Sequence, residues 1–321
     1  MNPVLASVLP VVEASQDVRL DEARLADVAS WLAYEELPVP ATFFPFPFAL
    51  TREETVDFVL VTAALNFAYT DLATRRRWDL VVDGRAYADA DGLHFAFHRA
   101  HLEGVPVLEG AWLAEVTVEQ LRHVLRGGSS DLQLLDERVA ILRALGETLL
   151  ERWDGRFHRF VATTSPGLYD GGAGFLESLV REFPRFDDRV GDVRFWKLAQ
   201  LAAWIMEITL RPQGGAGFAD LHELTAFADY IVPAALRVMG VLRYSGELSA
   251  AIDEGRLIEA GSAWELELRA NTIHACSLLC ARVNELRPPE LRVIVPQIDA
   301  RLWLPFHKTH APHHLTRTTA Y

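Results

Sequence analysis

The sequence predicts a mainly α-helical globule with one small β-hairpin, and three observations lead to this fold class. Apolar residues recur in most segments with the helical period of about 3.6 residues. Half of the 321 residues are hydrophobic and 23% are charged, so the chain can bury a sizeable core. No long linker, charge block or low-complexity segment divides the chain. We therefore expect one helical domain over residues 1–321, and leave open an arrangement of two lobes that share one cleft.

The first elements are two helices separated by an aromatic tract. Residues 18–37 carry an apolar helical face and form the first expected helix. The Phe–Pro tract at residues 43–48 then ends helical structure, because proline cannot continue a helix. Thr51 followed by Glu54 is a capping-box pattern, which predicts a second helix through residue 69.

The next segment differs, because short β-prone runs flank an Asp-Gly pair. Asp83 and Gly84 predict a hairpin at about residues 78–88, which is the only small sheet we expect. The remaining periodic segments predict helices at residues 94–103, 117–126, 135–153, 174–183, 195–210, 219–228, 233–244, 245–254 and 262–284. The tail from residue 288 is rich in proline and histidine, and we expect irregular structure with one strand or turn.

The charge balance excludes some classes of partner. The chain has 31 basic and 44 acidic residues, a formal net charge of −13, whereas a binder of intact DNA or RNA needs a basic face. A local basic pocket for one small anion stays open. Residues 1–12 are apolar but lack a basic start and a small-residue cleavage site, and apolar runs such as residues 58–68 are too short to span a bilayer. We therefore expect a soluble, cytoplasmic protein.

Cysteine and histidine give no metal site. Cys276 and Cys280 are the only cysteines, and their spacing predicts two buried thiols on one helix face. His94, His98 and His101 have helical spacing, but no nearby carboxylate completes a ligand set. Four more histidines crowd the tail, namely His307, His310, His313 and His314. We predict no metal and no cofactor. The fingerprints of dinucleotide, P-loop, zincin and α/β-hydrolase sites are also absent.

The strongest candidate for chemistry is Asp229. It lies between Phe227 and Tyr230 and just ahead of a helix whose first turn contains Pro233. The helix dipole stabilises a carboxylate there as an anion, while the aromatic neighbours exclude water. From spacing alone, Asp229 is either a functional anion or a helix cap, and both readings stay open.

The run from Phe227 to Tyr230, with Pro233, resembles the central motif of the queuosine salvage protein family. Further stretches resemble the family in the same order along the chain. They are Leu65 to Tyr69, Arg99-Ala100 with Glu103 to Pro106, Phe195 to Gln200, Ile298-Asp299 with Leu302-Trp303, and Pro312 to Tyr321. Where the family often has an aromatic residue and a second aspartate, this chain has Ala300 and Leu304.

The resemblance implies a fold similar to helix-hairpin-helix DNA glycosylases, and a reaction. Family members are queuosine 5′-phosphate N-glycosylases, which cleave the bond between ribose C1′ and a 7-deazaguanine base and release queuine and ribose 5-phosphate. Such cleavage builds positive charge on the sugar, which an ionised carboxylate stabilises. Asp229, in the matched motif, is the expected catalytic residue.

The same resemblance implies the substrate contacts. Phe227 and Tyr230 would stack on the base, and Asp299 would accept from its guanine-like N–H edge. A phosphate needs cations or N–H donors, and the candidates are Lys197, His314 and Arg317. Asn66 and Trp303 complete the expected substrate-binding residues.

The resemblance thus implies a small nucleotide as partner, with no intact nucleic acid and no membrane. Two alternatives stay open: a DNA-glycosylase-like enzyme acting on polymeric nucleic acid, and a helical binding protein without catalysis. The first would need a basic groove, and the second would need no ionised aspartate beside aromatic rings.

Overall fold

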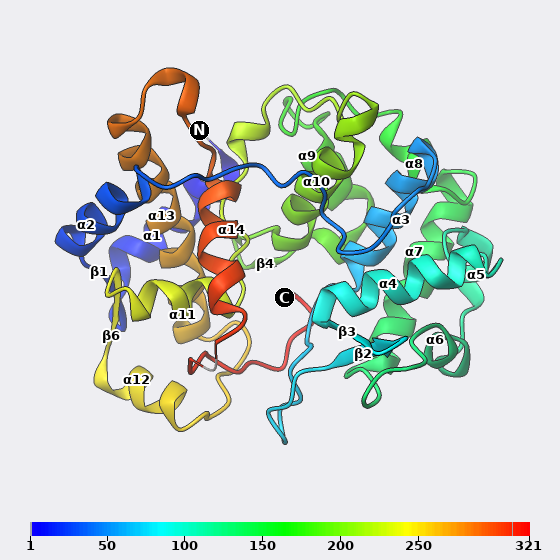
Figure 1. Ribbon diagram of the computed structural model, residues 1–321, viewed down its shortest axis with the longest axis horizontal. Helices are drawn as coiled ribbons and strands as arrows, with labels where there is room; N and C mark the ends of the chain where they lie inside the picture. The colour runs from blue at the N-terminus through cyan, green and yellow to red at the C-terminus, as the bar shows by residue number, and fades with distance from the viewer. Residues whose placement is uncertain (1, 310) are drawn as a thin grey trace.

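The computed structural model describes residues 2–309 and 311–321 of the chain, and in these residues the protein is mainly helical, as predicted (Figure 1). The α-helices of the described residues are α1 (Pro3–Ala14), α2 (Glu22–Leu32), α3 (Arg52–Ala64), α4 (Asp89–Leu102), α5 (Gly110–Glu115), α6 (Val118–Val124), α7 (Leu135–Arg152), α8 (Phe157–Val161), α9 (Phe175–Glu182), α10 (Lys197–Leu210), α11 (Ile231–Val238), α12 (Gly246–Asp253), α13 (Ala263–Leu286) and α14 (Val295–Phe306). The strands pair as β1 (Val18–Leu20) with β6 (Leu242–Tyr244), β2 (Asp79–Val82) with β3 (Arg85–Ala88), and β4 (Arg189–Val190) with β5 (Val193–Arg194), all antiparallel.

Two local predictions are confirmed in detail. The capping box opens α3, because Thr51 Oγ1 accepts from Glu54 N and Glu54 Oε2 accepts from Thr51 N at 3.0 Å. The Asp-Gly hairpin joins β2 to β3, and Asp83 and Gly84 have φ values of 48° and 76°. Positive φ at both turn residues is what a two-residue hairpin of this twist requires.

The second helix ends earlier than predicted. It stops at Ala64, and the chain turns through Asn66 to Ala68, whose φ is 49°. The guanidinium of Arg138, buried on α7, donates to the carbonyls of Leu65 and Phe67. These carbonyls are therefore satisfied by a distant side chain instead of by helical N–H groups.

The prediction of a single small sheet is wrong. Residues 18–20 form β1 and pair with β6, so the first predicted helix begins only at Glu22, where Asp21 accepts from Arg24 N. The pair β4–β5 is a third short ribbon. Strand pairing between distant segments leaves no helical or hairpin signal in the local sequence, so the periodicity alone extended the helix too far.

Two predicted segments have the wrong structure. Residues 219–228 are not a helix; apart from one 3₁₀ turn they lack regular structure, and side chains take their amides: Thr225 N donates to Gln200 Oε1 and Phe227 N to Asp299 Oδ2. The tail contains the helix α14, which begins with Pro296 in its first turn and has Pro305 near its end. Proline is compatible with a first turn, but these two prolines masked the helical pattern.

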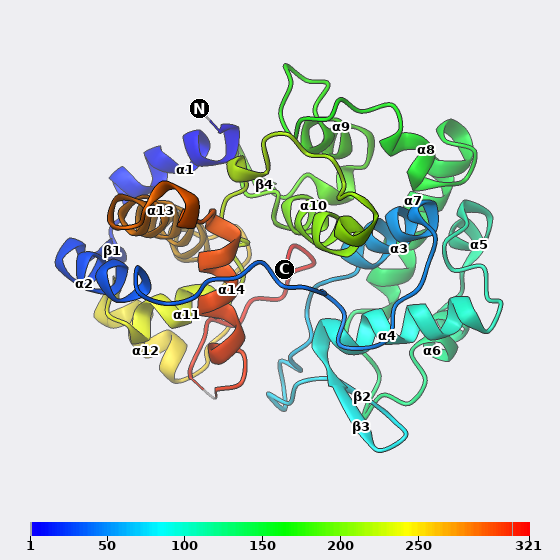
Figure 2. The same cartoon turned by 45° about the horizontal axis from the view of Figure 1, so that its top comes forward.

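The core forms two clusters, and the C-terminal segment runs between them. One cluster centres on α3, α4, α7 and α10, and the other on α2, α11, α13 and α14, where Cys276 and Cys280 lie buried as free thiols, as predicted. Figures 1 and 2 both show the end of the chain between the two groups of helices. The contacts of this segment agree with that position. Leu315 forms an isolated β-bridge with Leu257, which follows α12, and the carbonyl of Tyr321 accepts from the amide of Ala68, which follows α3, at 3.2 Å. No helix in the described residues has the length and apolarity to cross a membrane.

Candidate functional site

Asp229 is a buried carboxylate held by three N–H donors. Its Oδ1 accepts from the amides of Ile231 and Val232 at 2.7 and 3.1 Å, at the start of α11. Its Oδ2 accepts from the indole Nε1 of Trp303 at 2.9 Å, and the residue is 8% exposed. The aspartate is therefore a helix cap, and it also carries a second oxygen oriented by an aromatic side chain. The three donors together fix the orientation of both carboxylate oxygens.

A second carboxylate shares this centre. Asp299 lies buried on α14, and its Oδ2 accepts from the amide of Phe227 at 2.9 Å. Burial and the negative charge of Asp229 raise the pKa of Asp299 to about 7, although the Phe227 amide and the positive charge of Lys197 oppose the rise. Two neighbouring carboxylates resist ionising together. Asp299 is thus able to take or give up a proton near neutral pH.

Lys197 supplies the nearby positive charge. It opens α10 in a buried position, and its Nζ donates to the carbonyl of Asn66 at 3.5 Å. Burial lowers the pKa of Lys197 to about 8, while Asp229 and Asp299 pull it upward. The preceding residue, Trp196, has a φ of 46°, a strained value for a bulky side chain. Such strain is often found at functional sites.

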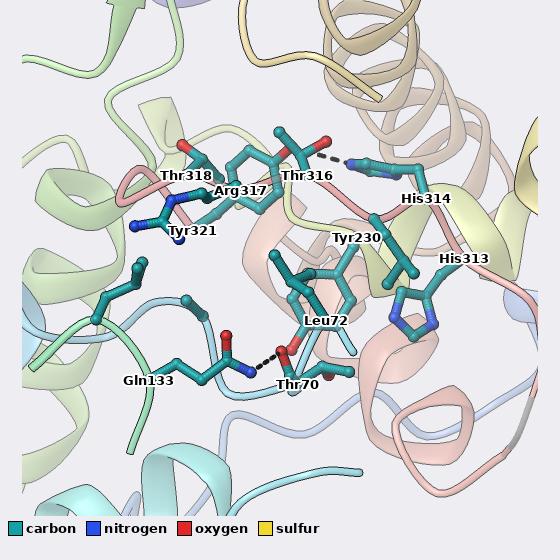
Figure 3. Close-up of a pocket in the computed structure, with 13 residues that line it drawn as sticks. Thr70, Leu72, Gln133, Tyr230, His313, His314, Thr316, Arg317, Thr318 and Tyr321 are labelled. Atoms are coloured by element: carbon teal, nitrogen blue, oxygen red, sulfur yellow. Dashed lines mark hydrogen bonds between the residues drawn. The ribbon is translucent and has the colours of Figure 1, made fainter. Parts of the chain in front are cut away.

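Tyr230, the residue after Asp229, lines an open pocket (Figure 3). It encloses about 400 Å³ between the side chains, including its open mouth. Tyr230 stacks on His313 with ring centroids 4.8 Å apart and 28° between the planes. Gln133 Nε2 donates to the carbonyl of Thr70 at 2.7 Å. The lining residues are Ala68, Thr70, Leu72, Gln133, Leu134, Tyr230, His313, His314, Leu315, Thr316, Arg317, Thr318 and Tyr321. The lining therefore includes both aromatic rings and hydroxyl-bearing side chains.

The two predicted phosphate ligands in this lining differ in charge. His314 is buried and its Nε2 lies 3.1 Å from the hydroxyl of Tyr321. Burial, with the neighbouring His313 and Arg269, lowers the pKa of His314 to about 3, so the ring is neutral at pH 7. Arg317 is exposed and pairs with Glu137 at 2.8 Å. Of these two residues, only Arg317 can offer a positive charge to an anion in the pocket.

The structure brings most of the predicted residues together. Asp229, Asp299, Lys197, the amide of Phe227 and the indole of Trp303 form one centre, with the carbonyl of Asn66 at its edge. Tyr230, His314 and Arg317 line the pocket. Asp229, Asp299 and Lys197 are not among the residues that line this pocket.

Sequence reasoning missed Arg269. This arginine is buried on α13, where it pairs with Asp188 and Glu265. Its Nε donates to the carbonyl of Ala228 at 3.2 Å, and its guanidinium lies 4.6 Å from the ring centroid of Tyr321. The sequence placed Arg269 in the predicted helix at residues 262–284, but nothing in it indicated that this arginine is buried or which partners it has.

The histidines that the structure describes do not gather around one point. Within residues 2–309 and 311–321, no three His, Cys, Asp or Glu side chains are grouped so that they could hold a metal ion. His94 and His98 pack among the phenylalanines of residues 43–48, and His101 lies 3.4 Å from Glu54. In the tail, His307, His313 and His314 each contact a different side chain, and His310 lies outside the described residues. The absence of a metal requirement stays a prediction.

Comparison with known proteins identifies relatives over the whole chain. A family model described as queuosine salvage protein matches residues 47–321. A queuosine 5′-phosphate N-glycosylase/hydrolase of Sphaerobacter thermophilus is 32% identical over 99% of this chain and 97% of its own. The proteins of the same name from Bos taurus and Schizosaccharomyces pombe are 28% and 24% identical, over 85% and 84% of this chain and 81% and 83% of their own.

Proposed function

Because the chain belongs to the queuosine salvage protein family, we propose that it hydrolyses the N-glycosidic bond of queuosine 5′-phosphate. The products are queuine and ribose 5-phosphate, and the reaction serves queuine salvage. The observation that carries this proposal is the buried Asp229 carboxylate, fixed by three N–H donors next to an aromatic pocket.

The carboxylate acts on the sugar. As the bond to the base lengthens, positive charge develops on the ribose, and the Asp229 anion stabilises it. The donors from Ile231, Val232 and Trp303 hold the carboxylate in place, so that little reorganisation is needed when the charge appears. The same group can also orient or deprotonate the attacking water.

The leaving base needs stabilisation elsewhere. A 7-deazaguanine has carbon in place of N7, so no acid assists departure at that position. Asp299, whose pKa is raised to about 7 by burial and by Asp229, can exchange a hydrogen bond with the base edge in either protonation state. Phe227 and Tyr230 are the proposed stacking surfaces, with Asn66 and Trp303 as further contacts. For the phosphate we retain Lys197 and Arg317 as cations and His314 as a neutral hydrogen-bonding group.

Several finer features belong to the same proposal. We propose a likeness to the helix-hairpin-helix DNA glycosylases, which the mainly helical architecture supports. One catalytic domain would comprise both core clusters, with the site where they meet. The substrate would be a mononucleotide and not an intact nucleic acid, because a net charge of −13 repels a phosphate backbone. A cytoplasmic location agrees with two buried free thiols.

One assay separates the proposal from its alternatives. The purified protein is incubated with queuosine 5′-phosphate, with queuosine, and with queuosine-containing tRNA, and free queuine is measured. We expect release from the nucleotide with the highest kcat/KM. Release from the polymer alone would favour a glycosylase of intact nucleic acid, and release from none of the three would favour a binding protein without catalysis.

A further inference from the structure

The indole of Trp303 is the donor to Asp229 that comes from another segment of the chain. Oδ1 of Asp229 is held by amides two and three residues further on, whereas Oδ2 is held by this side chain on α14, at 2.9 Å. The orientation of Oδ2 therefore depends on what fixes the indole ring.

His307 fixes one face of that ring. It lies one helical turn after Trp303, and the two ring centroids are 3.9 Å apart with 22° between the planes. Its Nε2 lies 2.7 Å from Oδ2 of Asp89. Nη2 of Arg77 also contacts this Nε2, and Nη1 of Arg77 donates to the carbonyl of His307, so Asp89 and Arg77 together hold the imidazole. The tautomer depends on which partner the ring nitrogen takes, the acceptor Asp89 or the donor Arg77. Burial, followed by the charge of Arg77, lowers the pKa of His307 to about 4, and a neutral ring suits this arrangement.

Asp89 anchors this chain of contacts in the other core cluster. It begins α4 directly after the hairpin, its amide donates to the carbonyl of Trp78 at 3.0 Å, and it pairs with Arg77. Its φ is 51°, a value that non-glycine residues seldom adopt, and its side chain is buried. A buried aspartate with a positive φ, whose Oδ2 meets both Arg77 and His307, indicates a role beyond a turn.

We propose that Asp89 and His307 are positioning residues that act through Trp303 to fix the catalytic carboxylate of Asp229. The inference rests on the proposed function, because it assigns these residues to that reaction. It also explains how two groups of helices with separate cores keep one carboxylate aligned: the contacts run from the hairpin, through the end of α14, to the start of α11.

Kinetics of single and double variants test whether His307 acts through Trp303. Removing a hydrogen bond to a charged group costs about ten- to hundred-fold, so Trp303→Phe should lower kcat by that factor. His307→Phe keeps a stacking ring but loses the ring nitrogen that contacts Asp89 and Arg77, and should lower kcat about fivefold to tenfold with little change in KM. His307→Gln keeps a donor and should restore most of the loss. The double variant Trp303→Phe/His307→Phe should have the same kcat as Trp303→Phe alone. Non-additive losses of this kind indicate that His307 acts through Trp303.

If the decrease in kcat of the double variant equalled the product of the two single decreases, the proposal would be overturned. Independent effects of this kind are expected when the histidine has only a structural role. Asp89→Asn should resemble His307→Phe, since asparagine tolerates the positive φ but weakens the bond to His307. Matched controls are Asp27→Asn and His123→Phe, which alter exposed residues on α2 and α6 and should leave kcat unchanged.

A readout independent of activity is the indole N–H resonance of Trp303, assigned by its loss in Trp303→Phe of the 15N-tryptophan-labelled protein. We expect this resonance to move in His307→Phe and Asp89→Asn, and to stay in place in both controls. An unmoved resonance in the two variants would refute the positioning role. If the wild-type protein released no queuine, the proposed function would fail, and the resonance would still decide whether these residues hold the indole.

Discussion

Asp229→Asn tests the central assignment, because the substitution keeps the shape of the side chain and removes its charge. A unit positive charge about 4 Å from the carboxylate, at an effective dielectric constant of about 20, is stabilised by about 4 kcal/mol. Loss of that term corresponds to a decrease in kcat of about a thousandfold. We therefore expect single-turnover release of queuine to slow by about three orders of magnitude, with substrate binding largely retained.

The structure also sets what the substitution does to the fold. The asparagine oxygen can still accept from Ile231 and Val232, so the cap of α11 is preserved. The amide nitrogen then faces the indole N–H of Trp303, and the lost hydrogen bond costs about 1–3 kcal/mol. Urea unfolding should report a decrease within this range, far from loss of the fold.

A second readout makes the prediction sharper. Burial is the main cause that raises the pKa of Asp299 to about 7, and the charge of Asp229 is the next. In Asp229→Asn the pKa of Asp299 should therefore fall, as followed by a 13C carboxyl NMR titration. Asp27→Asn, which alters an exposed carboxylate on α2, should change neither the rate of queuine release nor the pKa of Asp299. Queuine release within threefold of the wild-type rate would refute the catalytic assignment of Asp229.

Three other predictions concern Lys197, the buried His94 and the expected absence of a metal. Lys197→Ala should lower kcat/KM for queuosine 5′-phosphate about ten- to hundred-fold more than for queuosine, and equal losses on both substrates would make Lys197 structural. His94 is buried without a hydrogen-bond partner, and burial lowers its pKa to about 3. The folded state therefore keeps its full stability above the unfolded pKa of 6.5 and loses stability as the pH falls from 6.5 toward 3. His94→Phe should therefore raise Tm at pH 5 by about 2–4 °C and change it less at pH 8, and an equal change at both pH values would contradict the reasoning. Exhaustive EDTA treatment should leave queuine release intact, and loss that a divalent metal restores would contradict the prediction of no metal.

The sequence by itself determined the local features of this protein. Thr51 with Glu54 opens a helix, and Asp83 with Gly84 makes a hairpin, because each depends on residues a few positions apart. The central aspartate motif was equally readable, since the helix start that surrounds Asp229 is local. Its two readings, cap and functional anion, both agree with the observed contacts, because one oxygen binds the amides of α11 and the other binds Trp303.

Only the tertiary structure decided what distant segments contribute. Residues 219–228 carry a helical pattern but are not helical, because Gln200 and Asp299 take the amides of Thr225 and Phe227. The raised pKa of Asp299 and the lowered pKa of Lys197 likewise depend on burial and on charges brought in from other helices. A buried polar group needs a partner, and the chain can supply that partner from any segment. Local periodicity holds no record of which segment does so. The sequence therefore indicated Asp229 as a candidate but not the surroundings that shift the pKa values of Asp299 and Lys197.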